Sequence, residues 1–281
     1  WTALPIYFRI SDGVLIGDGC TFKDNFNKYG QIYVTGSSYG SVAVINNTQF
    51  IGNNATSASG GTGAAIYLGG TAAYQYSNGT VRPGAPSTVY VVGCEFINNS
   101  AKGANYYAGQ GGAIYVNNNA TLYVSDSRFI NNTCVDNNNG TIKSNGGAIY
   151  SSAGNVNIVN SVFENNVASE GSEIYMRAYG PDTTNLNFLN ISNSIIRDDG
   201  DSVIVSNYTN GTLLANNNWW GSNDNPADKV TEGITVDKWV IFNVDPTYVP
   251  MTEAQDVEIT IDFVHVTDAE GTITELEGTL P

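Results

Sequence analysis

The chain has 281 residues, of which 41% are hydrophobic and 13% charged, and its net charge is −15. This balance disfavours nucleic-acid binding, which needs a basic surface. Without a run of 18 or more apolar residues, no membrane span is predicted in this segment, and the apolar content is high and regular enough for a folded core.

Two short phrases recur along most of the chain, at intervals of 25 to 48 residues. The first phrase is a small residue, a spacer and Ile-Tyr, and its copies end at Tyr33, Tyr67, Tyr115, Tyr150 and Tyr175. The second phrase, Phe-x-x-Asn, begins at Phe22, Phe50, Phe96, Phe129 and Phe163. Such self-similarity is typical of one supersecondary unit stacked upon itself.

Apolar residues alternate ahead of each Phe, as at Val89 and Val91, and this period predicts strands. In the first two units the inward pair is expected one position earlier, at Val14, Ile16, Val42 and Val44. A coil of about three short strands cannot bury its own inner face, so the coils must stack in parallel. The sequence therefore predicts an all-β, right-handed parallel β-helix of about seven to nine coils.

The repeats also predict what fills the coil. We expect a Phe ladder ending in Ile196 and an Ile ladder from Ile32 to Ile174 inside it. The Asn pairs after each Phe suit tight corners, because Asn tolerates the left-handed backbone region. The long insertions at 55–88, 100–111 and 133–146 are expected to project from one side as contact loops.

The tyrosine of each Ile-Tyr phrase should point away from the core, since neighbouring strand residues face opposite sides. Two interpretations remain open for this row: an exposed aromatic stripe that binds a partner, or a structural stack covered by the insertions. Tyr90 and Tyr123 are expected to start a second row on a neighbouring sheet. The binding candidates are Tyr33, Tyr67, Tyr115, Tyr150 and Tyr175.

Ten Asn-x-Ser/Thr sequons favour an exported glycoprotein. The glycosylation candidates are Asn46, Asn54, Asn78, Asn98, Asn119, Asn131, Asn139, Asn190, Asn207 and Asn210. Cys20 and Cys94 share a position in the repeat, two coils apart and too distant for a disulfide, so each should fill a small core slot. Cys134 is expected in an Asn-rich loop, free or cross-linked to another chain.

The repeat vocabulary stops after Gly211, and residues 1–245 are predicted to form the β-helix, with a cap at about 212–245. Trp219, Trp220 and Trp239 suit that cap, because the end of a solenoid exposes apolar rungs; an aromatic sugar platform is the rival interpretation. Asp224 and Asp228, which lie among asparagines, are candidate ligands for Ca²⁺, although their spacing matches no established calcium-binding loop. No cofactor or other metal site is predicted.

Residues 246–281 form a predicted β extension, whose strands read 256–263 and 271–276. They fit the start of an immunoglobulin-like domain. Alternatively, they pair with a sheet edge on the helix or on a neighbouring molecule.

The coil phrases, the Asn-Trp-Trp-Gly-x-Asn-x-x-Pro phrase at 218–226 and the following Thr-Ile-Asp-Phe strand resemble adhesin-like surface proteins of methanogenic archaea. The coil phrases alone are also similar to bacterial polymorphic outer-membrane and autotransporter-type β-helices. The resemblance implies a secreted protein of the cell surface or cell wall, with a β-helix and immunoglobulin-like domains.

Parallel β-helices also carry polysaccharide lyases and hydrolases, which need clustered carboxylates with a base. The strongest candidate for such a carboxylate cluster, at 197–201, is interpreted as a polar corner. The only histidine, His265, lies outside the coils. We therefore expect no catalytic residues and a non-catalytic adhesin-like module that attaches to glycans or to surface proteins of other cells. The alternatives are a wall or filament component that self-associates through its ends, and a polysaccharide enzyme.

Overall fold

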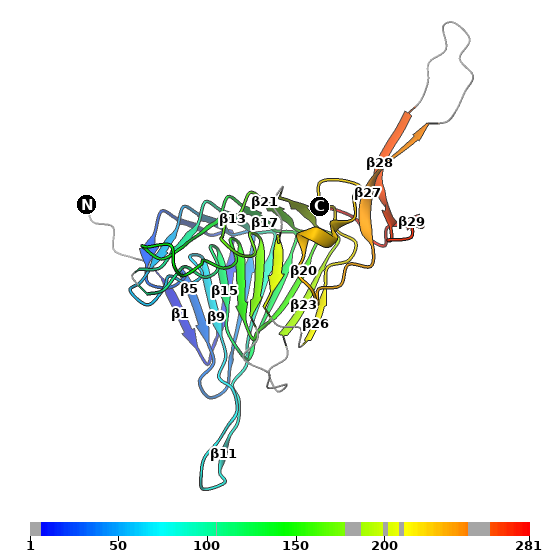
Figure 1. The fold of residues 1–281 in the computed structure, drawn as a ribbon. Helices are drawn as coiled ribbons and strands as arrows, with labels where there is room; N and C mark the ends of the chain where they lie inside the picture. Colours follow the sequence, from blue (N-terminus) through cyan, green and yellow to red (C-terminus); the bar gives the residue numbers. More distant parts are fainter. Residues whose placement is uncertain (1–6, 105, 178–186, 199–201, 208–210, 247–258) are drawn as a thin grey trace, which may run out of the picture.

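The computed structural model describes residues 7–104, 106–177, 187–198, 202–207, 211–246 and 259–281. Parallel strands stack into a β-helix, from β1 at the N-terminal end to β26 (Figure 1). The predicted fold class is thereby confirmed as an all-β parallel solenoid. Within the described residues, no helix has the length and apolar character needed to cross a membrane.

Two seven-stranded sheets run the length of the coil. The first sheet consists of β1 (Phe8–Ser11), β5 (Ile32–Thr35), β9 (Ile66–Gly69), β15 (Ile114–Val116), β19 (Ile149–Ser152), β22 (Ile174–Arg177) and β25 (Ile204–Ser206). The second sheet consists of β2 (Val14–Asp18), β6 (Ser41–Asn46), β12 (Ser87–Val92), β16 (Ala120–Ser125), β20 (Asn155–Val159), β23 (Asn187–Ser192) and β26 (Gly211–Leu214).

Two shorter sheets complete each coil. The third sheet contains β3 (Thr21–Lys23), β7 (Gln49–Ile51), β13 (Glu95–Ile97), β17 (Arg128–Ile130), β21 (Val162–Glu164) and β24 (Ile195–Arg197). The fourth contains β4 (Phe26–Asn27), β8 (Asn54–Thr56), β14 (Ser100–Lys102) and β18 (Thr133–Val135). This fourth strand was not predicted, because its short segments follow Asn corners and read as turn.

The predicted core ladders form. Phe22, Phe50, Phe96, Phe129 and Phe163 occupy successive registers of the third sheet, with ring centroids 4.5–5.0 Å apart. Ile196 follows Phe163, and the bridge between Ile195 and Trp219 places Trp220 next in the row. Fully burying each such ring stabilises the fold by about 1.5–3 kcal/mol.

The inward positions of the first two coils differ from the prediction. Val14 and Ile16 are each 73% exposed, and Val42 is exposed as well, whereas Ala43 and Ile45 are buried. The register pairs Leu15 with Ala43 and Ala43 with Val89, so the inward row does not shift. The expectation was wrong because β-branched residues at outward positions resemble a core pattern.

Buried asparagines line the corner between the third and fourth sheets. The side chains of Asn53, Asn99, Asn132 and Asn166 form a hydrogen-bonded ladder in which each Nδ2 donates to the next Oδ1 at 2.8–3.0 Å. The preceding residue of each corner takes the left-handed conformation, as at Asn98 (φ 55°) and Asn131 (φ 56°). The first Asn therefore turns the chain, and the second satisfies buried polar groups.

The three cysteines are free. Cys94 is buried at the position that Thr48 and Ser127 take in neighbouring coils, whereas Cys20 is exposed in the N-terminal part of the coil. Cys134 is not in a loop: it lies buried in β18, paired with Ala101, and this burial raises the pKa of its thiol. A thiol in that position cannot reach another chain.

The C-terminal end is closed by aromatic residues and by added strands. Trp220 and Trp239 are buried in the main core, and Trp219 packs edge-on against Phe263 with centroids 5.0 Å apart. A 3-10 turn, η1 (Pro226–Lys229), lies between these tryptophans in the sequence. The predicted boundary of the cap, at about 212–245, stays a prediction.

The final strands lie at the coil end. Strand β28 (Ile259–Thr267) runs antiparallel to β27 (Trp239–Pro246) and to β29 (Ile273–Glu275), and β27 and β28 extend beyond the coil (Figure 1). Leu276 is buried with Val240 and Val266, and Asn193 Nδ2 donates to the carbonyl of Glu277 at 2.6 Å. The three strands form a sheet of their own, which a bridge between Asn218 and Trp239 joins to the coil end. Pairing with an edge of the coil sheets and an immunoglobulin-like continuation both stay predictions.

Candidate functional site: an outward tyrosine and asparagine row on the second sheet

The tyrosine row of the first sheet forms in register, with ring centroids 4.5–5.6 Å apart from Tyr33 to Tyr175. Its exposure falls along the coil: Tyr33 and Tyr67 are half-buried, while Tyr115 (9%), Tyr150 (1%) and Tyr175 (7%) form a separate buried cluster. Three of the five candidate binding rings are therefore inaccessible to a partner. Over the C-terminal half of this sheet, the outward-facing tyrosines are covered by other parts of the protein and do not contact solvent.

Two of the corners that enter the first sheet come close to this row. The left-handed Gly63 and Gly171 lie so close to the row that an added Cβ would come 2.9 Å from Tyr115 Cβ and 3.1 Å from Tyr175 Cβ respectively. Burial raises the pKa of Tyr175 to about 12, with the nearby Glu170 carboxylate as the next cause. Sequence periodicity places the rings outward but does not reveal how closely the corners approach.

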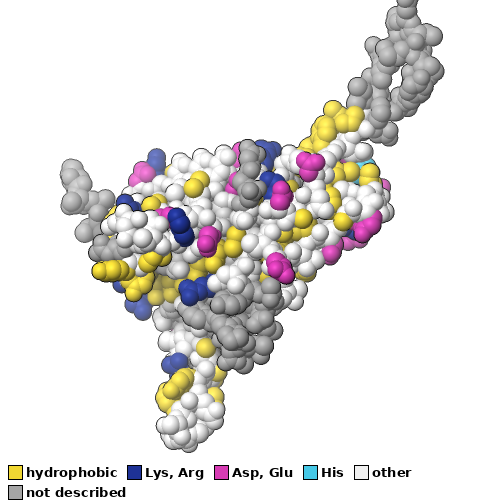
Figure 2. Space-filling model, in the orientation of Figure 1, with side chains coloured by type: hydrophobic (Ala, Val, Ile, Leu, Met, Phe, Trp, Pro, Cys, Tyr) yellow, Lys and Arg dark blue, Asp and Glu magenta, His cyan; other side chains and the backbone are white. Residues whose placement is uncertain are grey.

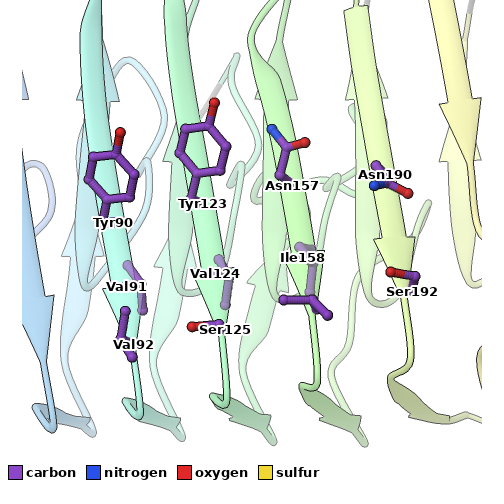
Figure 3. Close-up of a pocket in the computed structure, with 11 residues that line it drawn as sticks. Tyr90, Val91, Val92, Tyr123, Val124, Ser125, Asn157, Ile158, Asn190 and Ser192 are labelled. Atoms are coloured by element: carbon purple, nitrogen blue, oxygen red, sulfur yellow. The ribbon is translucent and has the colours of Figure 1, made fainter. Parts of the chain in front are cut away.

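The second sheet carries the more exposed row. Tyr90 pairs in register with Tyr123, their rings stack with centroids 5.0 Å apart, and each side chain is 41% exposed. Asn157 and Asn190 follow in the next two coils. Figure 3 shows the two rings side by side in front of their strands, with their hydroxyls turned the same way and the asparagines continuing the row.

These residues line a groove of about 320 Å³. Its outward-facing wall also includes Val92, Ser125, Val159 and Ser192, one coil after another in the adjoining register. No charged residue lines the groove. Tyrosine offers a broad apolar ring with a polar tip, and asparagine both donates and accepts hydrogen bonds. The surface suits an uncharged ligand with apolar and hydroxyl groups.

The insertions leave the coil at two corners, not on one side as expected. A hairpin of β10 (Tyr74–Gln75) and β11 (Val81–Arg82) links the first sheet to the second and projects from the coil (Figure 1). The segments after β14 and β18 instead lie between the fourth and first sheets. Among the described residues of these three insertions, the long projection is the hairpin, and it exposes Tyr74 and Tyr76.

Other sequence candidates remain separate from this groove. Asp198 follows β24, and Lys229 Nζ donates to its carbonyl at 2.7 Å; residues 199–201 of the same cluster lie outside the described residues. His265 Nδ1 lies 2.8 Å from Asp262 on β28, and this contact lowers the pKa of Asp262. In the described part of the chain, no group of three or more His, Cys, Asp or Glu is placed to hold a metal, and Asp224 contacts Ser222.

The predicted sequons occupy different environments. Asn78, Asn98, Asn131, Asn139 and Asn207 are exposed, whereas Asn46, Asn54, Asn119 and Asn190 are half-buried, and Asn210 lies outside the described residues. Asn190 is also part of the groove. Whether any of these residues carries a glycan stays a prediction.

Comparison with known proteins gives one family match. Residues 93–117 and 126–152 match the Chlamydia polymorphic membrane protein repeat. Each matched segment holds one Phe-x-x-Asn phrase and one Ile-Tyr phrase, and it covers three of the four strands of a coil. Neither a search of curated proteins nor one of solved structures gave a match.

The two matched segments cover far less than half of the chain, so they describe its coils and not the whole protein. Together with the parallel sheets, they support the part of the resemblance that concerns surface proteins built on a β-helix. The archaeal part of the resemblance stays a prediction.

Proposed function

We propose that this chain is a surface-exposed, adhesin-like module that binds an uncharged glycan chain, without catalysis, along the outer face of its second sheet. One observation carries the proposal: an uncharged groove in which the exposed pair Tyr90 and Tyr123 continues into Asn157 and Asn190. The repeat match to polymorphic membrane proteins supports a location at a cell surface.

The geometry of the row favours a linear ligand. Neighbouring strands lie about 4.8 Å apart, so the four positions extend for about 14 Å across the sheet. A sugar chain on this row would place its rings on the tyrosines and its hydroxyls against the amides. The flanking serines, Ser125 and Ser192, add further hydrogen-bonding groups.

The test is glycan-array binding by protein made in a host that does not attach glycans, because a glycan on Asn190 would occupy the same groove. We expect Tyr90→Ala and Tyr123→Ala each to weaken binding about tenfold, which corresponds to about 1.4 kcal/mol. Tyr74→Ala is the matched control, since this tyrosine is exposed on the hairpin and lies outside the groove. Binding that is unchanged in both groove variants would contradict the proposal.

A cell-attachment assay with the same variants distinguishes a protein ligand. If no glycan binds but attachment to cells still depends on Tyr90 and Tyr123, the groove recognises a protein, and the glycan proposal is wrong. If attachment depends on neither tyrosine, the groove is not the binding site.

Self-association through the C-terminal strands is a second candidate, favoured by the side chains of the β27–β28 ribbon. Val244, Ile261 and Val264 are 44–57% exposed there. Exposed apolar side chains on a projecting ribbon favour contact with a second surface. Sedimentation velocity should show oligomers that Ile261→Lys dissociates; a monomer at every concentration would contradict this candidate.

A further inference from the structure

The tyrosine row of the first sheet is open at its N-terminal end, where it forms a pocket. Tyr29 joins the row there, with its ring centroid 5.2 Å from that of Tyr33 and 5.6 Å from that of Tyr67. The pocket measures about 370 Å³, within the range of small-molecule sites. Its lining consists of Tyr7, Arg9, Asn27, Lys28, Tyr29 and Tyr33.

Two cations are held over these rings. The Arg9 guanidinium lies 5.5 Å from the ring centroid of Tyr33, and Lys28 Nζ lies 4.9 Å from that of Tyr29. No acidic residue lines the pocket, and neither of the ion pairs found in the described part of the chain involves Arg9 or Lys28. Figure 2 shows basic and hydrophobic side chains together at this end of the coil.

A pocket lined by two basic residues and no acidic residue is unusual in a chain with a net charge of −15 and only 11 basic residues. Cations that lack a carboxylate partner remain available to an external anion.

We propose that this pocket binds an acidic saccharide, whose carboxylate pairs with Arg9 and Lys28 while its sugar ring packs on Tyr7 and Tyr29. The amide of Asn27 offers a further polar contact to the sugar hydroxyls. The site differs in chemistry from the uncharged groove of the second sheet, and its ligand differs accordingly.

Isothermal titration calorimetry with trigalacturonic acid and with its fully methylated ester tests this site, because the ester keeps the rings and loses the charges. We expect the acid to bind and the ester to bind at least tenfold more weakly. Arg9→Ala and Lys28→Ala should each weaken binding of the acid at least tenfold, and Lys28→Arg should retain most of it. Lys23→Ala is the control, because Lys23 is an exposed cation on β3 outside the pocket.

Three results would overturn the proposal: no binding of the acid at millimolar concentration, equal binding of acid and ester, or unchanged binding in both cation variants. The Tyr90→Ala/Tyr123→Ala variant should bind the acid like the unaltered chain. This comparison separates the pocket from the groove, so that failure of one proposal leaves the other standing. Circular dichroism of each variant checks that the β-helix is retained.

Discussion

Two rows of tyrosines on adjacent sheets of the same coil have opposite environments. Both rows stack at about the spacing of the coils, yet Tyr150 of the first sheet is 1% exposed and Tyr123 of the second sheet is 41% exposed. Glycine turns approach the first row at Tyr115 and Tyr175, whereas the second row faces an open groove. Repetition therefore fixes the stacking, whereas the exposure of the rings differs between the two sheets.

The first prediction concerns the loss of one buried tyrosine side chain from the first sheet. Tyr150→Ala should lower the free energy of unfolding by about 3–5 kcal/mol, because it leaves a cavity within a packed cluster. Urea denaturation followed by circular dichroism measures the change. Tyr123→Ala is the matched control and should cost about 1 kcal/mol or less. Equal losses in the two variants would show that the rows do not differ.

The second prediction concerns the buried asparagine ladder. Asn132→Ala removes the acceptor of both the backbone N–H and the Nδ2 of Asn99, and should destabilise the fold by about 2–4 kcal/mol. The neighbouring Asn131→Gly should change stability by less than about 0.5 kcal/mol, since glycine adopts the same left-handed conformation. The two urea midpoints, measured side by side, test the ladder; a midpoint for Asn132→Ala that matches the unaltered chain would contradict it.

The third prediction concerns Glu173, which lies buried where the asparagine ladder ends and accepts a hydrogen bond from Asn166. Burial raises the pKa of Glu173 well above its usual value, with the Asp198 and Glu164 carboxylates as further causes. A raised folded pKa means that the protonated acid favours folding. This contribution is complete below the unfolded pKa and is lost as the pH rises through the folded pKa.

Glu173→Gln should therefore be more stable than the unaltered chain at pH 8, and the advantage should shrink toward pH 4. Denaturation midpoints across this range measure it. An advantage that does not vary with pH would show that ionisation of Glu173 is not involved.

Residue spacing predicts the core but not its surroundings. The Phe and Ile ladders could be predicted because inward positions repeat with the coil, and Trp220 could be assigned to the cap because its phrase has no copy upstream. The burial of Tyr115 could not be predicted, because residue spacing does not reveal contacts across the corners, such as the close approach of Gly63 to this residue. Val14 and Ile16 were wrongly expected to point into the core, because β-branched residues favour strands on either face.

Only part of the groove could be predicted from the sequence. Tyr90 and Tyr123 recur at equivalent positions and could be assigned to a second row, but Asn157 and Asn190 share no residue type with them. Only the parallel register aligns the four side chains. The pairing of Arg9 with Tyr33 was likewise beyond sequence reasoning, because the two residues lie in different coils and meet only when β1 pairs with β5.

The most direct test of the central claim compares binding and stability in two variants. The account predicts that Tyr90→Ala/Tyr123→Ala keeps a urea midpoint close to that of the unaltered chain but loses glycan binding. It also predicts that Tyr150→Ala loses stability, yet binds the glycan with unchanged affinity under conditions where it remains folded. A groove variant that still binds, paired with a folded Tyr150→Ala that does not, would contradict the account.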